Sequence, residues 1–321
     1  MPLALLFPGQ GSQEVGMGRD LALAYPEAAR TFDEADEILG LRLSRIMWEG
    51  PEEELVLTAN AQPAILVHSV AVLRVLGEEL GPVHLAGGHS LGEFTAHVAA
   101  GTLEFPDALR AVRRRGQLML EAGNRRPGSM AALLGLDEEQ AQAVCREASK
   151  EDSVVVTANL NSPGQVVISG DEAAVERALP IARDAGAKKA VPLKVSGAFH
   201  SPLMEPAREG LRKELGAVSF RRSRFPVVAN VDAGPVDDPE RARDLLVEQL
   251  TAPVRWQDCV EAMVAGGVDR FLELGPGSVL KGLNRRIARG VPTESVGTPG
   301  AVELLLRSSE TTGQAGGAPA L

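Results

Sequence analysis

The chain has 321 residues, of which 44% are hydrophobic and 3% are aromatic. This composition suffices for one large or two modest domains with a core of Leu, Val and Ala. The formal net charge of −10 argues against broad binding of nucleic acid and against adhesion to an anionic membrane. The two cysteines, Cys145 and Cys259, lie far apart, so the sequence suggests neither a disulfide framework nor a metal site.

The N-terminal apolar run, residues 3–7, follows no Lys or Arg and is too short for the hydrophobic region of a signal peptide. No apolar run is judged long enough to span a bilayer. We therefore expect a soluble, cytoplasmic protein. Residues 3–7 instead predict a central parallel strand that ends at Pro8-Gly9.

The loop after this strand, residues 8–13, lacks the Gly-Lys-Ser/Thr of a phosphate loop. It also lacks the third glycine of a dinucleotide fingerprint, because Glu14 stands at that position. We interpret it as a loop that presents Gln10 from the carboxyl end of a strand, where open α/β sheets bind their ligands. A surface glutamine is the alternative.

Residues 83–93 predict a buried strand, a glycine-lined turn and the start of a helix. Within them, Gly88-His89-Ser90-Leu91-Gly92 fits the G-x-S-x-G nucleophile elbow, which places its serine on a strained turn. In such a turn the serine attacks a carbonyl, and the N–H of the next residue, here Leu91, receives the oxyanion. An ordinary turn with a buried serine is the alternative, because this short motif also arises by chance.

Helical periodicity extends over residues 26–38, 63–80 and 105–122, and the last of these carries Arg113-Arg114-Arg115. Neighbouring residues of a helix face different directions, so we expect two of these arginines to be solvated. An arginine turned inward pairs well with a substrate carboxylate, since its planar head offers two parallel donors.

The pattern changes after residues 125–128. Strands are predicted at residues 130–134, 153–158, 165–169 and 189–195, and helices at residues 137–148 and 171–185. Their order along the chain, βαββαβ, is that of a ferredoxin-like domain. We assign residues 1–124 and 196–307 to a discontinuous core and residues 125–195 to the insertion. Residues 308–321, rich in Ser, Thr, Gly and Ala, are expected to be a mobile tail.

A nucleophilic serine needs a general base, and the chain contains five histidines. His200 lies in a predicted loop and follows the serine along the chain, as in hydrolase-type triads. A surface histidine is the alternative. No acidic residue stands out as the third member, and Asp232 and Asp237 qualify by chain order only.

Six stretches resemble, in order, the malonyl-CoA:acyl carrier protein transacylases of dissociated fatty acid synthesis: residues 7–13, 88–93, 115–116, 161–165, 199–201 and 249–253. The resemblance spans residues 3–306. It implies an α/β-hydrolase-like core with a parallel sheet and a ferredoxin-like insertion. It also implies ping-pong transfer of malonyl from malonyl-CoA, through a malonyl-serine, to the phosphopantetheine thiol of acyl carrier protein. Such transfer supplies fatty acid biosynthesis and needs no cofactor besides the substrate malonyl-CoA.

The resemblance implies a catalytic role for four residues. Ser90 matches the nucleophile and His200 the general base. Gln10 and the backbone N–H of Leu91 match the oxyanion donors.

Three further residues match positions that bind or orient. Arg115 matches the residue that binds the free malonyl carboxylate. Gln249 matches a residue whose main-chain carbonyl orients the histidine, which explains why no acid stands out. Phe199 resembles the malonyl-selecting version of its loop, where methylmalonyl-type relatives tend to carry Ser.

The implied partners are malonyl-CoA and acyl carrier protein, with a monomeric enzyme and neither nucleic acid nor membrane. Because the carrier protein and this chain are both acidic, transient docking requires a local basic patch. The candidates are Arg125-Arg126, Lys188-Lys189, Arg221-Arg222-Arg224 and Arg285-Arg286.

Three other functions stay open. The same elbow serves a hydrolase that uses water as acceptor. A non-catalytic protein would use its glycine loops to hold a nucleotide or CoA. A free-standing acyltransferase of polyketide synthesis would differ only in the carrier protein that docks.

Overall fold

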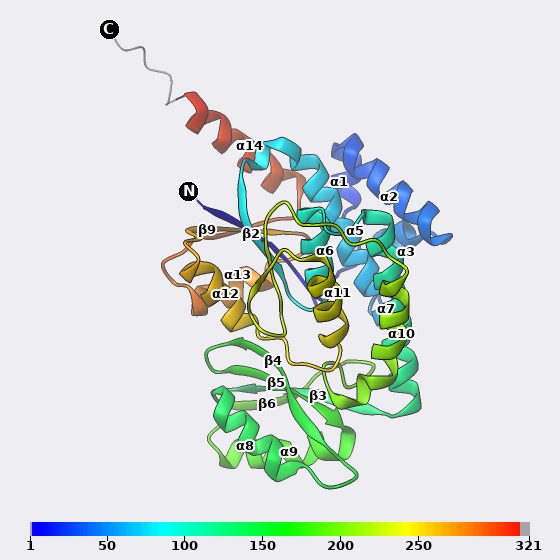
Figure 1. Cartoon of the computed structure of the whole chain (residues 1–321), viewed down its shortest axis with the longest axis vertical. Helices are drawn as coiled ribbons and strands as arrows, with labels where there is room; N and C mark the ends of the chain where they lie inside the picture. The colour runs from blue at the N-terminus through cyan, green and yellow to red at the C-terminus, as the bar shows by residue number, and fades with distance from the viewer. Residues whose placement is uncertain (1, 315–321) are drawn as a thin grey trace.

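The computed structural model describes residues 2–314. The larger part is built around a six-stranded sheet of order β10-β9-β1-β2-β7-β8 (Figure 1). All neighbours are parallel except β7 and β8. The strands are β1 (Leu3–Phe7), β2 (Val83–Gly88), β7 (Val227–Val228), β8 (Pro235–Val236), β9 (Arg270–Leu274) and β10 (Thr293–Val296). The apolar run of β1 is fully buried between β2 and β9, as predicted for a central strand.

Helices cover both faces of this sheet. They are α1 (Arg19–Ala24), α2 (Pro26–Leu39), α3 (Leu43–Glu49), α4 (Glu52–Leu55), α5 (Thr58–Leu76), α6 (Leu91–Ala100), α7 (Phe105–Arg125), α10 (Glu205–Gly216), α11 (Pro239–Glu248), α12 (Trp256–Ala265), α13 (Val279–Ile287) and α14 (Pro299–Gln314). Alternate residues of β1 point to opposite faces. Leu5 therefore belongs to the cluster that contains Ile65 of α5 and Phe94 of α6, whereas Leu6 belongs to the cluster of Trp256 in α12.

Helix α5 corrects the expectation that no apolar run is long enough to span a bilayer. Together with the following 3-10 turn, η1 (Gly77–Leu80), it forms a stretch that is long and apolar enough by length and composition, and 78% of its apolar window is buried inside the protein. The stretch is a core helix that packs against α2, α6 and α7. It begins at Thr58 rather than at the predicted residue 63.

The smaller part is a four-stranded antiparallel sheet of order β4-β5-β3-β6, with two helices. Its elements are β3 (Gly128–Leu134), α8 (Glu138–Ala148), β4 (Val155–Ser162), β5 (Gln165–Asp171), α9 (Glu172–Asp184) and β6 (Lys189–Pro192). The predicted order of strands and helices is present, and these elements enclose their own apolar core. The fold is therefore mixed α/β, with a mainly parallel sheet and a separate antiparallel one.

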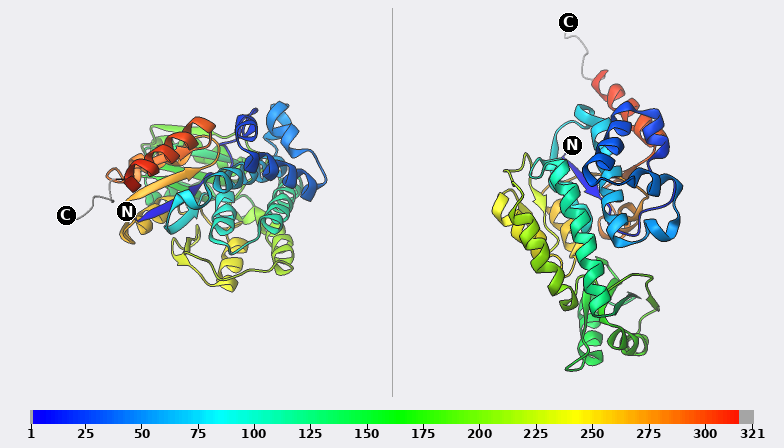
Figure 2. Two further views of the ribbon diagram at one scale, coloured as in Figure 1. Left: turned by 90° about the horizontal axis from the view of Figure 1, so that it is seen from above. Right: turned by 90° about the vertical axis from the view of Figure 1, so that its right-hand side faces the viewer.

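The two parts lie at opposite ends of an elongated molecule (Figures 1 and 2). The long helix α7 runs from the larger part to the smaller one, and α10 packs beside it. After β6, the chain returns through a loop and the 3-10 turn η2 (Pro202–Met204) into α10. Helix α14 includes residues 308–314, the first part of the segment predicted to be a mobile tail. Residues 315–321 of that segment lie outside the described residues.

Candidate active site

A sharp turn joins β2 to α6 at Ser90, as the G-x-S-x-G motif predicts. Ser90 has φ 52° and ψ −106°, which is unusual for a residue with a side chain. Glycine is required on both sides of it. A Cβ on Gly88 would lie 1.9 Å from the backbone carbon of Gly92, and a Cβ on Gly92 would lie 2.0 Å from the Phe7 oxygen. These contacts pack the start of α6 directly against the ends of β2 and β1.

The structure places His200 against Ser90 although 110 positions separate them along the chain. The Ser90 Oγ lies 2.8 Å from Nε2 of His200, and Nδ1 of His200 lies 2.9 Å from the main-chain oxygen of Gln249. A carbonyl only accepts, so Nδ1 carries the proton and Nε2 is free to accept the serine proton. The imidazole is 4% exposed. Burial and the nearby Arg115 lower the pKa of His200 to about 3, so the imidazole is neutral at physiological pH and its Nε2 lone pair is available to accept a proton.

The third member of this arrangement is thus a backbone carbonyl rather than an acid. Asp232 and Asp237, the candidates by chain order, are exposed and pair with Arg241 and Arg222. No local pattern in the sequence marks a carbonyl for this position.

Of the three consecutive arginines in α7, only Arg115 reaches the serine. It is 1% exposed, and its Nη2 donates to Ser90 Oγ at 3.1 Å and to Gln249 Oε1 at 2.8 Å. Burial lowers its pKa to about 10, so it stays charged. Arg113 donates to the Ala59 oxygen, and Arg114 pairs with Glu121 near the surface.

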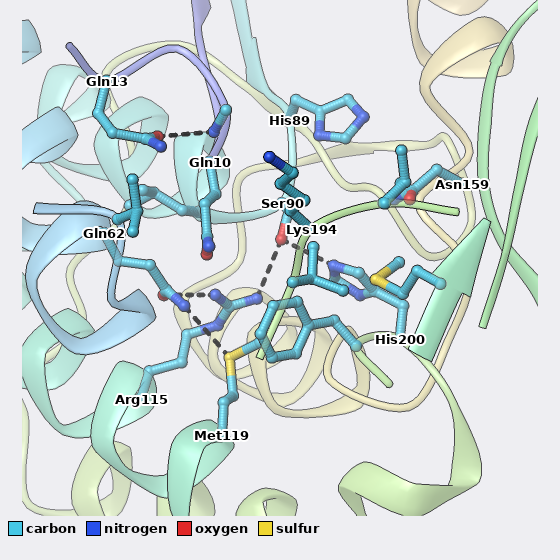
Figure 3. A pocket seen from close by; sticks show the side chains of 17 residues that line it. Gln10, Gln13, Gln62, His89, Ser90, Arg115, Met119, Asn159, Lys194 and His200 are labelled. Atoms are coloured by element: carbon cyan, nitrogen blue, oxygen red, sulfur yellow. Dashed lines mark hydrogen bonds between the residues drawn. The ribbon is translucent and has the colours of Figure 1, made fainter. Parts of the chain in front are cut away.

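A cavity of about 330 Å³ opens beside these groups (Figure 3). Its lining includes all but one of the predicted site residues: Gln10, Ser90, Leu91, Arg115, Phe199 and His200. The exception, Gln249, lies behind them and is fully buried. The side-chain oxygen of Gln10 accepts from Thr58 Oγ1 at 2.9 Å, which leaves its amide N–H groups as donors.

Three residues of the site carry no motif that identifies them in the sequence. Gln62 accepts from Arg115 Nη1 at 2.5 Å. Asn230 holds the elbow, since its Oδ1 accepts from the Ser90 N–H at 2.7 Å and its Nδ2 donates to the Gly88 oxygen at 2.8 Å. Glu93 is buried one helical turn after the serine. Asn230 follows β7 by two residues, at the carboxyl end of a parallel strand, where α/β sheets place their ligand-binding residues.

Within residues 2–314, no group of three or more His, Cys, Asp or Glu side chains is arranged to hold a metal ion. The functional groups at the cavity are a serine hydroxyl, a neutral imidazole, a guanidinium and amide donors. This set suits acyl transfer through an ester, with an anionic group held beside the reacting carbonyl.

Comparison with known proteins defines the class. The acyl transferase domain family matches residues 4–298, so the chain belongs to that family. Among curated proteins, the malonyl CoA-acyl carrier protein transacylase of Bacillus subtilis (strain 168) is 46% identical over 306 residues, which are 95% of this chain and 96% of that protein. The enzyme of the same name from Escherichia coli (strain K12) is 46% identical over 305 residues, covering 94% and 98%. The chain is thus a member of the malonyl CoA-acyl carrier protein transacylase family.

Solved structures agree with this assignment. The acyl-carrier-protein-S-malonyltransferase of Bartonella henselae superposes with a TM-score of 0.92 at 44% identity, covering 97% of this chain and 100% of that one. A malonyl-transacylase in complex with a type II polyketide acyl carrier protein superposes with a TM-score of 0.91 at 44% identity, covering 96% and 100%.

Proposed function

We propose that this chain transfers malonyl from malonyl-CoA to the phosphopantetheine thiol of acyl carrier protein and so supplies fatty acid biosynthesis. One observation carries the proposal beyond the family assignment. Arg115 Nη2 and His200 Nε2 lie within hydrogen-bond distance of the same atom, Ser90 Oγ. A nucleophile, its base and a cation for a carboxylate therefore meet at one point of the cavity.

In the first half-reaction, Ser90 gives its proton to His200 and attacks the thioester carbonyl. The N–H of Leu91 and the Gln10 amide stabilise the oxyanion. The C–S bond then breaks, and the CoA thiolate takes the proton from His200. In the second half-reaction, His200 takes the proton of the phosphopantetheine thiol, whose sulfur attacks the ester. The Ser90 alkoxide leaves and recovers the proton.

Two residues would select malonyl. Its free carboxylate would pair with the Arg115 guanidinium, whose buried position excludes competing water. Phe199 is 6% exposed and lines the same cavity. We expect its ring to restrict the space beside the malonyl methylene group.

We further propose that acyl carrier protein docks at a basic hollow between the two parts of the molecule. Lys188 directly precedes β6, and Lys189 is its first residue. Arg286 lies in α13, and Arg289 lies just after that helix. Together they line a hollow of about 510 Å³. Two patches predicted separately thus join into one, and β6 leads from it to the loop that carries His200. Elsewhere, Arg126, Arg221 and Arg222 of the other patches pair with carboxylates.

The finer description of the fold also belongs to this proposal. We interpret the larger part as an α/β-hydrolase-like core formed by residues 1–124 and 196–307. The smaller part, residues 125–195, has the strand order of a ferredoxin-like domain. A monomer in the cytoplasm, with malonyl-CoA as its only small-molecule requirement, completes the proposal.

Intact mass spectrometry after mixing with malonyl-CoA tests the central step. We expect a malonyl adduct on the wild-type protein and none on Ser90→Ala. Absence of an adduct on both proteins would favour a non-catalytic binding protein. Rapid release of free malonate, at a rate that rivals transfer, would favour a hydrolase. Assays with fatty acid and polyketide carrier proteins distinguish the two acceptors, since a structural relative is complexed with the latter kind.

A further inference from the structure

A buried carboxylate lies beside the site and has no role in the proposed reaction. Glu93, in the first turn of α6, is 0% exposed. Its Oε2 accepts from the Asn230 N–H at 2.9 Å and from Gln249 Nε2 at 2.7 Å, whereas Oε1 has no hydrogen-bond partner among the described residues. Burial raises the pKa of Glu93 to about 7 against the opposing effects of these bonds and of Arg115. Burying such a group is costly, so its placement calls for a reason.

The side-chain amide of Gln249 is the group that Glu93 contacts most closely. Its nitrogen faces three acceptors: Glu93 Oε2 at 2.7 Å, the Ser90 oxygen at 3.0 Å and Asn230 Oδ1 at 3.3 Å. Its oxygen faces one donor, Arg115 Nη2, at 2.8 Å. The Glu93 oxygen makes the shortest of these three bonds.

The orientation of this amide decides what Arg115 meets. The two ends of an amide are nearly equal in shape, so their partners determine which end points where. In the inverted orientation, NH₂ would face the guanidinium, and two donors would oppose each other. Arg115 would then lose one of the two contacts that hold Nη2 beside Ser90 Oγ.

We propose that Glu93 is a positioning residue: by accepting from Gln249 Nε2, it turns the Gln249 amide oxygen toward Arg115 and so presents the guanidinium to the malonyl carboxylate. This rests on the proposed function of Arg115. Acetyl transfer has no carboxylate to pair with Arg115. Loss of the Glu93 acceptor should therefore lower transfer of malonyl much more than transfer of acetyl.

The test is the ratio of kcat/KM for malonyl-CoA to that for acetyl-CoA, in which the fraction of folded enzyme cancels. We expect Glu93→Leu to lower this ratio about 10-fold or more, the usual effect of losing a hydrogen bond to a charged group, chiefly through KM for malonyl-CoA. Glu93→Gln keeps an acceptor oxygen and should recover most of the ratio. An unchanged ratio in Glu93→Leu would overturn the proposal. Equal losses in both variants would overturn it too, because the negative charge rather than the acceptor would then matter.

Glu273 in β9 provides a matched control. It is also 0% exposed and accepts from the N–H groups of Leu280 and Lys281 and from Ser295, away from the cavity. Glu273→Leu should lower stability and leave the ratio unchanged; a fall equal to that of Glu93→Leu would show that any buried leucine has this effect.

Two further measurements keep the proposal testable. If Glu93→Leu does not fold, Glu93→Asp withdraws the carboxylate by one methylene and should also lower the ratio; an unchanged ratio would overturn the proposal. Wild-type enzyme without malonyl preference would instead contradict the proposed function itself.

Discussion

The main-chain oxygen of Gln249 accepts a hydrogen bond from Nδ1 of His200 at 2.9 Å, at the position where a Ser-His-Asp triad has a carboxylate. A neutral carbonyl fixes the tautomer and the ring orientation without adding a charge. It therefore stabilises an imidazolium less than an acid would. This agrees with the low pKa of His200, which burial and Arg115 set at about 3.

Removing the His200 imidazole tests its proposed role as general base. We expect His200→Ala to slow formation of the malonyl-enzyme by 10²–10⁴, on the order of the usual loss of a general base. Quenched-flow mass spectrometry of the adduct measures this rate directly. His84→Ala is a control, because His84 contacts the Gly266 oxygen far from the cavity. A rate within a factor of about two of wild type in His200→Ala would remove His200 from the reaction.

Substitution of Arg115 should change which acyl group is preferred. Arg115→Ala leaves the malonyl carboxylate without a partner in a buried site, so we expect kcat/KM for malonyl-CoA to fall on the order of 10²-fold. The kcat/KM for acetyl-CoA should rise relative to that for malonyl-CoA. Arg114→Ala on the same helix is the matched control, since Arg114 pairs with Glu121 at the surface. Unchanged selectivity in Arg115→Ala would exclude the proposed role.

Acid should destabilise this protein through its buried histidines. Burial lowers the pKa of His68 to about 4 and that of His97 to about 3, and His200 behaves similarly. Their unfolded forms take up protons below about pH 6.5, whereas the folded forms stay neutral. The contribution of these histidines to the free energy of unfolding is thus greatest above pH 6.5 and falls as pH decreases toward 4, whereas Glu93, whose pKa is raised by burial, opposes it in part.

At pH 5 each such histidine lowers the free energy of unfolding by about 2 kcal/mol relative to pH 8. Urea unfolding at pH 5, 6 and 8 measures this dependence. His97→Gln removes the contribution of one histidine, so the fall in the free energy of unfolding between pH 8 and pH 5 should be smaller in this variant. A free energy of unfolding that stays constant across this range would contradict the prediction.

Charge reversal at the basic hollow should affect only the second half-reaction. We expect Lys188→Glu combined with Lys189→Glu, and separately Arg286→Glu, to lower the on-rate of acyl carrier protein and to flatten its salt dependence. Formation of the malonyl-enzyme from malonyl-CoA should be unchanged. Arg222→Glu is the control at another patch, where Asp237 is already its partner. If the control slows carrier-protein turnover and the hollow variants do not, the docking surface lies elsewhere.

The glycines of the elbow should be among the least replaceable. Gly92→Ala would place a Cβ 2.0 Å from the Phe7 oxygen, so backbone must shift, and we expect a loss of about 2–4 kcal/mol. Gly282→Ala in α13 meets no atom within 4 Å and should instead stabilise by about 0.5–1 kcal/mol. Thermal unfolding of the two variants compares them. A neutral Gly92→Ala would mean that α6 is free to move away from β1.

Local signals explain the parts of the fold that the sequence predicts well. A run of five apolar residues predicts β1, and hydrophobic periodicity with turn residues predicts the order of elements in the smaller part. Elements with weaker patterns were missed. Strand β10 is short and only partly apolar, and α3 and α4 have seven and four residues, too few for a clear helical period.

The strained turn at Ser90 is predictable from the local sequence, since Gly88 and Gly92, which permit it, lie two residues before and two residues after the serine. The close approach of Gly92 to the Phe7 oxygen, in contrast, arises from tertiary packing. Together with the family resemblance, the sequence also singled out His200 and Arg115. The tertiary structure explains why Arg115, and neither neighbouring arginine, faces the serine. It also brought Glu93 and Asn230 behind Gln249, and Lys188 and Lys189 beside Arg286. The proximity of residues so distant in the sequence depends on how the helices pack and where the loops re-enter the core. Packing is a property of the whole chain, which no short window of residues contains.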